Sequence, residues 1–331
     1  MVKPPHSCKL CLGTDSVRIP YVNQLYKLRG AENAKMFDAM EIQVCRKCGF
    51  GEVCTEIDQE RLSRFYELEY RSPESHEAID YEHHYPVASS RDFSQYVDTR
   101  RNSLAQFDTF LDIGPGYGGA LRLVSFLNPA CSIYALEANP DAASCFKKAI
   151  RNFKNTSHID EIKSVSIVFM SHVLEHMTHM ESLNLLVMLR SKIKGALMAE
   201  VPHVDFRHFV HSQDAPHLQF FSEESFRKLL ISAGYNILYS SQTGNPLKRG
   251  DGLAQRMSAC RSLNDLPNDQ YGVGTMSHSV KTLKNTAARI GFSGLLDVLN
   301  VYRLTFRYAE ELSAENRFEA DCLRIVAEPA A

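Results

Sequence analysis

Two pairs of cysteines have the spacing of a metal site. The segments "CKLC" and "CRKC" carry Cys8, Cys11, Cys45 and Cys48, with 33 residues between the pairs and a glycine soon after each. Each Cys-x-x-Cys turn presents two thiolates, and the glycines permit the tight backbone around them. Four thiolates fill a tetrahedral zinc shell and leave no open position for chemistry. The spacing predicts a structural zinc ribbon, with incidental thiols or a redox pair as alternatives.

A glycine-rich turn follows a short apolar stretch further along the chain. In "FLDIGPGYGG", Asp112 ends a predicted strand and is followed by Gly114, Gly116 and Gly118 at the start of a predicted helix. Glycines at these points allow a ligand to approach the backbone at a helix N-terminus. The next predicted strand, "SIYALE", ends at Glu137, where a carboxylate can bind both hydroxyls of a ribose. The pattern predicts a cofactor that contains a ribose.

The glycine spacing discriminates between cofactors. An NAD site is expected to read Gly-x-Gly-x-x-Gly, with no acid before the first glycine. Here the third glycine comes one position early, and Asp112 precedes Gly114 by two positions. An NAD-dependent oxidoreductase is therefore the alternative, not the main hypothesis.

The segment "MSHVLEHM", residues 170–177, contains His-x-x-Glu-His. This is the zinc-ligand and base pattern of the inverzincin metallopeptidases, which need both histidines inside a long helix. The preceding "SVSIVFM" has the apolar, β-branched composition of a buried strand, so His172 is expected at the carboxyl edge of that strand. We reject the peptidase interpretation and expect His176 to pack or cap locally.

After residue 106, apolar runs alternate with helical stretches. This alternation predicts a doubly wound α/β fold with a parallel sheet, and that sheet positions the motifs. Ligands bind such sheets outside the carboxyl ends of the strands. We therefore divide the chain into a zinc-binding ribbon at 1–60, a helical connector at 61–105 and a Rossmann-like domain at 106–331. The ribbon is expected to hold the fold and the domain to bind the ligands.

Composition limits the partners. The formal net charge is -2 and 44% of the 331 residues are apolar, so the chain can bury a core and has no basic footprint for nucleic acid. No apolar run approaches the roughly 20 residues that span a bilayer. The nine cysteines form two metal-type pairs rather than a disulfide framework, which indicates a reducing compartment. We expect a cytoplasmic protein that binds neither nucleic acid nor membrane.

The motifs resemble those of the class I S-adenosylmethionine-dependent methyltransferases. The matching stretches are "LDIGPGYGG", the acid in "ALEANP", "SHVLEHM", and "HLQFFSEESFRKLLISAGYNIL". Together with the cysteine pairs and "FYELEYRSPES", the chain is similar, over about residues 6 to 245, to the sugar methyltransferases with an N-terminal zinc-binding domain. The resemblance implies methyl transfer from S-adenosylmethionine to a small polar acceptor, with a nucleotide-linked or glycan sugar as the expected substrate. A non-catalytic module with the same fold is a second alternative.

The resemblance also implies which residues bind the cofactor. The glycines approach its methionine part, Glu137 binds its ribose, and Asp160 meets the adenine amino group. Ser171 and His172 pass beside it, and Tyr66 and Tyr70 lie near the cleft. The cofactor-binding set that it implies is Asp112, Gly114, Gly116, Gly118, Glu137, Asp160, Ser171 and His172.

One departure from the family concerns the acceptor. Sugar C-methyltransferases of this type carry a Glu-His pair before the "FS" segment, whereas this chain has Pro216 and His217. Loss of that glutamate makes O- or N-methylation at least as well supported as C-methylation.

The segment after the fifth predicted strand supplies candidates for a general base. It carries several ionisable side chains, namely Glu200, His203, His208, His211, Asp214 and His217. Methyl transfer needs positioning and a base, and a neutral histidine with a pKa near ~6.5 suits that task. We favour His203 or His217 as the base, followed by His172 or Glu200. These histidines could instead cap loops, bind anionic substrate groups or hold a second metal.

The end of the chain contains a further expectation. In the family's fold the sixth strand is followed by an antiparallel seventh, and "YNILYSSQT" and "DCLRIVAE" match these two strands. A helical insertion at about 245–318 would then separate them. Its apolar "SGLLDVLNVYRLTF" favours a core or interface role, so the insertion would recognise the acceptor or form the surface of a homodimer.

Overall fold

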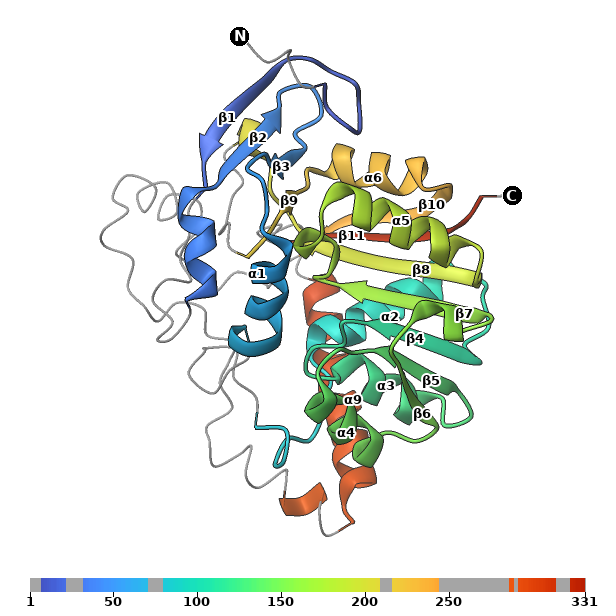
Figure 1. The fold of residues 1–331 in the computed structure, drawn as a ribbon. Coiled ribbons are helices and arrows are strands. Elements are labelled where there is room, and N and C mark those ends of the chain that lie inside the picture. The colour runs from blue at the N-terminus through green and yellow to red at the C-terminus, as the bar shows by residue number, and fades with distance from the viewer. Residues whose placement is uncertain are drawn as a thin grey trace.

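The computed structural model describes residues 7–21, 32–70, 80–208, 216–243, 286–288, 291–313 and 322–330. Within them lie a seven-stranded sheet, the helices that cover it and a four-stranded N-terminal sheet (Figure 1). The predicted residues His211 and Asp214 lie outside the described residues, as do 245–285, 289–290 and 314–318 of the predicted insertion.

The large sheet has the mixed order that the sequence predicts. Its strands, from one edge to the other, are β10 (Tyr235–Thr243), β11 (Cys322–Pro329), β8 (Ile193–Pro202), β7 (Val165–Ser171), β4 (Thr109–Ile113), β5 (Ser132–Leu136) and β6 (Phe153–Thr156). The strands from β8 to β6 are parallel, while β11 is antiparallel to both β8 and β10. The α/β fold class and the pairing of the last two strands are therefore confirmed.

Each face of this sheet has its own apolar core. Strand β4 shows the reason, because successive side chains point to opposite faces: Leu111 packs in one core and Phe110 in the other. Helices α5 (His179–Arg190) and α6 (Glu223–Ser232) cover the first face. Helices α3 (Gly119–Leu127) and α4 (Pro140–Ala149) cover the second, and α2 (Ser90–Asn102) packs against α3.

The N-terminal sheet is completed by a strand from far along the chain. It is built from β1 (Ser16–Pro20), β2 (Glu41–Cys45), β3 (Gly51–Val53) and β9 (Gln219–Phe220), in that order. Strand β9 pairs antiparallel with β3, and Phe50 of the ribbon packs in the same core as α5 and α6. The ribbon is thus not built from residues 1–60 alone, since residues of the later domain form part of it.

Short helices connect the ribbon to the large sheet. They comprise η2 (Asn33–Ala39), α1 (Gln59–Arg64) and the π-helical η3 (Phe65–Glu69). Helix α1 begins at an Asp58 cap, and α2 begins at a capping box of Ser89 and Asp92. The remaining short elements are η4 (Ile159–Glu161), η5 (Leu174–His176) and η6 (Phe206–His208), each of which follows a strand of the large sheet.

The described part of the predicted insertion contains a long helix, α9 (Ser293–Ser313), beside α2 and α3 (Figure 1). It is anchored by Asp297, which accepts hydrogen bonds from Arg122 and Tyr85, and by the fully buried Leu304. No helix in the described ranges is long and apolar enough to cross a membrane.

Candidate active site and metal centre

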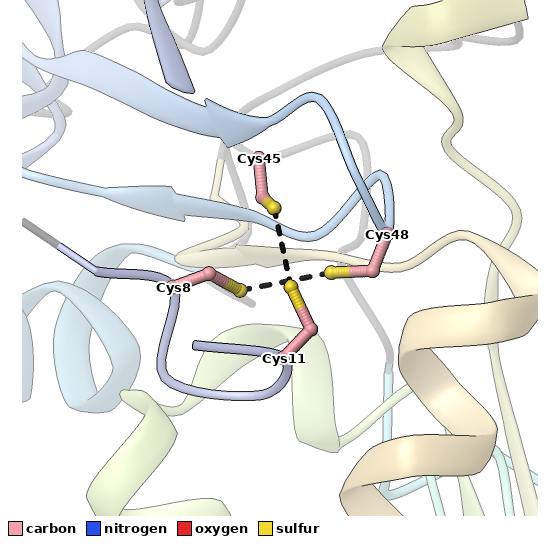
Figure 2. Close-up of side chains that lie close together, drawn as sticks. All are labelled: Cys8, Cys11, Cys45 and Cys48. Carbon is pink, nitrogen blue, oxygen red and sulfur yellow. Dashed lines mark hydrogen bonds between the residues drawn. The ribbon is translucent and has the colours of Figure 1, made fainter. Parts of the chain in front are cut away.

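The four predicted zinc ligands converge on one point (Figure 2). Sγ of Cys8 lies 3.6 Å from Sγ of Cys48, and Sγ of Cys11 lies 3.5 Å from Sγ of Cys45. Zn–S bonds of about 2.3 Å in a tetrahedron place sulfurs about 3.8 Å apart, close to these spacings. Three of the four cysteines are buried, and a cation would allow four thiolates to share so small a space. The donor set therefore fits a structural zinc ion.

The turn after Cys45 is held in place by contacts with residues of the Rossmann-like domain. Gly49 has φ +71°, and a Cβ at this position would lie 2.8 Å from Arg207 Nε and 2.9 Å from Ser222 Cβ. The Ser222 hydroxyl donates to the Cys48 carbonyl at 2.5 Å, and Arg207 donates to the Lys47 carbonyl at 2.8 Å. The cysteine site consequently fixes the chain around Ser222, directly after β9.

The glycine turn has the shape of a ligand cradle. Gly114, Gly116 and Gly118 have φ values of +64°, +57° and +73°, a region that side chains with a Cβ rarely adopt. At Gly118, which caps α3, a Cβ would lie 2.5 Å from Cε1 of Phe146. The turn brings backbone N–H groups and the N-terminus of α3 to the carboxyl edge of the sheet.

Two carboxylates stand at the ends of the neighbouring strands β4 and β5. Burial raises the pKa of Asp112 well above its usual value, and the nearby charges of Asp92 and Glu137 raise it further. The Gly114 N–H donates to the Leu136 carbonyl at 3.1 Å, which brings the glycine turn against the end of β5. Glu137 follows β5 directly and accepts a hydrogen bond from the backbone N–H of Asn139 at 2.9 Å. A glycine cradle with an acid at the second strand end fits the amino-acid and ribose parts of S-adenosylmethionine.

His172 directly follows β7 and has a left-handed backbone, with φ +57°. Its Nδ1 lies 3.2 Å from Glu175 Oε1, and its Nε2 lies 3.6 Å from Sγ of Cys322. Burial alone would lower the pKa of His172, but hydrogen bonds with Cys322, Glu175 and Glu200 raise it well above the usual value. Its Nε2 also lies 3.0 Å from Nη1 of Arg91, a group that can only donate, so both imidazole nitrogens are engaged and His172 is a poor candidate for the general base. Ser171 beside it accepts a hydrogen bond from Gln95 at 2.8 Å.

Glu200 belongs to a fully paired ionic group. Its Oε2 lies 2.6 Å from Nε of Arg324, which also donates to Asp98 at 2.6 Å, and its Oε1 lies 3.4 Å from Nε of Arg91. Burial alone would raise the pKa of Glu200, but Arg324, His172 and Arg91 hold it well below its usual range. This group joins α2, β8 and β11, and its charges are compensated internally. Its role is to hold these elements together, so Glu200 is a poor candidate for the base.

A second polar group lies past the end of β7, and we call it the edge cluster: Tyr66, Glu175, His176 and His217. The ring centroids of His176 and His217 are 5.1 Å apart, and Nδ1 of His176 lies 3.0 Å from the Tyr66 hydroxyl. Tyr66 also donates to the Pro216 carbonyl at 3.3 Å. Tyr70 packs against both Tyr66 and His176. The predicted base His217 is therefore surrounded by the aromatic side chains that the resemblance places near the cleft.

The edge cluster adjoins the glycine cradle. A Cβ at Gly114 would lie 2.9 Å from Cγ2 of Val173, two residues before Glu175. Burial alone would raise the pKa of Glu175, but His172, His176 and His217 lower it, so the buried carboxyl group is ionised. Sequence reasoning treated His176 as a packing residue. The His-x-x-Glu-His pattern does indicate ionisable side chains at this position. Its only chemical interpretation from sequence, however, is a metallopeptidase site, which the strand before His172 excludes.

Two predicted residues do not join these sites. Asp160 lies in η4, just after the carboxyl end of β6, is largely exposed and is 3.7 Å from Lys192. This contact does not join it to the glycine cradle, so its role at the adenine amino group stays a prediction. His203 lines a separate surface pocket of about 470 Å³ with Arg207 and Glu223. It does not group with His217, so the second metal site predicted from the later histidines is not assembled by the residues that are described.

Comparison with known proteins agrees with the fold. Residues 81–240 match the family described as "Methyltransferase domain". The chain is similar to a SAM-dependent methyltransferase from Archaeoglobus fulgidus, with 16% identity over 72% of this chain and 91% of that chain and a TM-score of 0.41. It is similar to a chain of the complex that contains the Haloferax volcanii Trm112 methyltransferase activator, with 12% identity, coverages of 73% and 95%, and a TM-score of 0.41.

A third similar structure is N,N-8-amino-8-demethyl-D-riboflavin dimethyltransferase from Streptomyces davawensis, with 20% identity, coverages of 45% and 50%, and a TM-score of 0.34. No curated protein matches the chain. The matched residues 81–240 contain the glycine cradle, both strand-end acids and the edge of β7. The domain and the strand order define a methyltransferase fold. Residues 81–240 thus carry a methyltransferase domain, which favours S-adenosylmethionine-dependent methyl transfer over the oxidoreductase.

Proposed function

We propose that the enzyme methylates a hydroxyl oxygen of a small polar acceptor, and that this acceptor is a nucleotide-linked or glycan sugar. The observation that carries the proposal is the position of the edge cluster, which adjoins the glycine cradle through Val173. An acceptor held there lies beside the reacting end of the cofactor. Aromatic side chains such as Tyr66 and Tyr70 offer flat apolar faces and hydroxyl groups, both of which suit a sugar.

In this proposal the cofactor lies along the carboxyl ends of β4, β5 and β7. The three glycines approach its methionine part, Glu137 binds the ribose hydroxyls, and Ser171 and His172 flank it. S-adenosylmethionine supplies a methyl group on a positively charged sulfur. The protein has to hold the acceptor in line with that carbon and to remove the acceptor's proton.

We assign deprotonation of the acceptor to the edge cluster. His217 is 8% exposed and sits against His176, whose ring is oriented by Tyr66. A neutral imidazole can accept a proton, whereas both nitrogens of His172 are already engaged by Glu175 and Arg91. Pro216 stands where the similar C-methyltransferases carry a glutamate. This difference supports an oxygen acceptor, or a nitrogen acceptor, over carbon.

The zinc site has a structural role in the proposal. Four cysteine ligands close the coordination shell, so this ion takes no part in methyl transfer. Its contribution is to hold the ribbon, and with it β9 and the chain that leads from His217 to Ser222. Loss of the ion should therefore displace the backbone that carries His217 and so disturb the acceptor site.

Two further parts of the proposal concern location and assembly. The eight cysteines among the described residues are all free thiols, which supports a reducing, cytoplasmic compartment. Helix α9 and the residue before it expose apolar side chains that support a homodimer surface or an acceptor-recognition surface: Phe292, Leu295, Val298, Leu299, Tyr302 and Phe306.

A methyl-transfer assay tests the proposal. S-adenosylmethionine with a labelled methyl group is incubated with the enzyme and with separate panels of nucleotide-linked sugars, oligosaccharides, nucleic acids and peptides. We expect label in a sugar panel and in no macromolecule. Label only in nucleic acid or peptide would refute the substrate class. Failure of S-adenosylmethionine to bind in calorimetry would refute the cofactor site.

A further inference from the structure

The edge cluster contains the ligand set of a cation site that is separate from the cysteines. Ligand atoms of Glu175, His176 and His217 lie within 4.8 Å of one another. Two imidazoles and one carboxylate can hold a divalent metal ion and leave coordination positions open for a further ligand. The cysteine site differs in this respect, because its four thiolates complete the shell.

The state of Glu175 points to a missing cation. Its side chain is 1% exposed, and Oε1 lies 3.2 Å from Nδ1 of His172. Oε2 has no hydrogen-bond partner among the described residues. A buried carboxylate without hydrogen bonds is unstable unless a cation compensates it. Oε2 faces no such compensation from the residues described.

The neighbouring ionic group provides a contrast. His172, Glu200 and Cys322 also place ligand atoms close together, but Arg324 and Arg91 lie 2.6 Å and 3.4 Å from the Glu200 carboxylate. Those guanidinium groups already supply the positive charge that a metal ion would bring. A cation is therefore expected at Glu175 and not at Glu200.

Tyr66 prepares His176 for coordination. The Tyr66 hydroxyl donates its proton to the Pro216 carbonyl, so its oxygen can accept a hydrogen bond from Nδ1–H of His176, 3.0 Å away. This tautomer leaves the lone pair of the imidazole on Nε2. Metal-binding histidines typically have their second nitrogen fixed by such a hydrogen bond.

We propose that Glu175, His176 and His217 bind a divalent transition-metal ion, and that an open coordination position takes the acceptor hydroxyl. The two nitrogen ligands favour Mn²⁺, Fe²⁺, Co²⁺ or Zn²⁺ over Mg²⁺ and Ca²⁺. This inference rests on the proposed function and specifies how the acceptor is activated. It replaces deprotonation by the His217 imidazole with deprotonation of a hydroxyl whose pKa the bound cation lowers.

The chemical step balances without any other reactant. The acceptor O–H bond breaks and its proton passes to water at the open edge of the sheet. The oxygen forms a bond to the methyl carbon as the carbon–sulfur bond breaks. The electron pair of that bond stays on sulfur, which becomes a neutral thioether. The metal ion keeps its oxidation state throughout.

Manganese binding tests the site independently of turnover. Enzyme whose cysteine site is loaded with zinc is titrated with Mn²⁺, and free Mn²⁺ is measured by electron paramagnetic resonance. We expect one Mn²⁺ per chain, and at least tenfold weaker binding in Glu175→Gln. His83→Ala is the matched control, because His83 is exposed and ion-paired with Asp80 at 2.9 Å. Binding that is absent from the wild-type protein, or equal in Glu175→Gln, overturns the proposal.

A second measurement covers the case in which Glu175→Gln does not fold. Crystals of the wild-type protein are soaked in Mn²⁺, and anomalous scattering is expected between Glu175, His176 and His217; its absence there overturns the site. Removal of the ion with a chelator should lower turnover at least tenfold with S-adenosylmethionine affinity unchanged. Full turnover without the ion refutes the metal inference while the proposed function stands. Failure to bind S-adenosylmethionine refutes the proposed function instead.

Discussion

The cysteine site and the edge cluster are built in opposite ways. The four cysteines come from two short turns with regular spacing, while Tyr66, His176 and His217 come from three segments that only the fold brings together. The first is closed by four like ligands, and the second mixes hydroxyl, carboxylate and imidazole groups. A site that only holds the fold can be encoded locally, whereas a site that binds a substrate draws on several elements around a shared edge.

The two regions are nevertheless connected. Ser222 donates a hydrogen bond to the Cys48 carbonyl, and Tyr21 of the ribbon donates to the His217 carbonyl at 3.0 Å. The backbone that carries His217 is thus held by the ribbon at two points. The comparison can therefore be tested by mutation. A substitution in the cysteine site should lower the stability of the protein, whereas a substitution in the edge cluster should lower turnover.

The largest effect is expected for Cys48→Ser. Loss of one thiolate opens the zinc shell and should destabilise the protein by about 4 kcal/mol or more. Metal analysis should find less than one zinc per chain, and thermal unfolding should begin earlier. Cys54→Ser is the matched control, because Cys54 lies outside the four-cysteine group. An equally stable and active Cys48→Ser protein would remove the structural site.

The next effect is expected for His217→Ala. Positioned general acid–base or metal-ligand groups typically contribute about 10² to 10⁴-fold in rate, so turnover should fall at least a hundredfold. Cofactor affinity and zinc content should stay close to those of the wild-type enzyme. Steady-state kinetics and calorimetry measure both. A raised Michaelis constant with turnover kept would instead indicate that His217 binds an anionic substrate group.

Glu137→Ala should weaken cofactor binding and leave the cysteine site and the edge cluster intact. Two hydrogen bonds from ribose hydroxyls to a carboxylate are lost, each worth roughly 1.5 to 3 kcal/mol. The dissociation constant for S-adenosylmethionine should rise at least tenfold in calorimetry. Unchanged affinity would show that the end of β5 does not contact the ribose.

The smallest effect is expected for Tyr66→Phe. It removes the hydroxyl that orients His176 and keeps the ring that packs against Tyr70. One neutral hydrogen bond contributes about 1 kcal/mol, so turnover should fall roughly fivefold with stability little changed. A loss as large as that of His217→Ala would assign Tyr66 a direct part in catalysis.

The sequence predicts the fold better than it predicts the acceptor site. Alternating apolar runs, the glycine turn and Glu137 are local signals, and the strand order follows from them. The role of Asp160 stays a prediction, because the length of the turn after β6 does not show whether this side chain faces the cofactor or only Lys192. The sequence does not show that His176 belongs to the edge cluster, because its partners lie 110 and 41 residues away, at Tyr66 and His217. Likewise, no local pattern shows that β9 completes the ribbon.

The central claim is that an oxygen acceptor is methylated at the edge cluster. The most direct test uses S-adenosylmethionine with a ¹³C-labelled methyl group, together with the sugar that accepts label in the assay above. Nuclear magnetic resonance of the product then identifies the atom that carries the methyl group. We predict a methyl ether on a sugar hydroxyl, formed by the wild-type enzyme and at least a hundredfold more slowly by His217→Ala. A methyl group on carbon, or equal rates for the two proteins, would contradict this account.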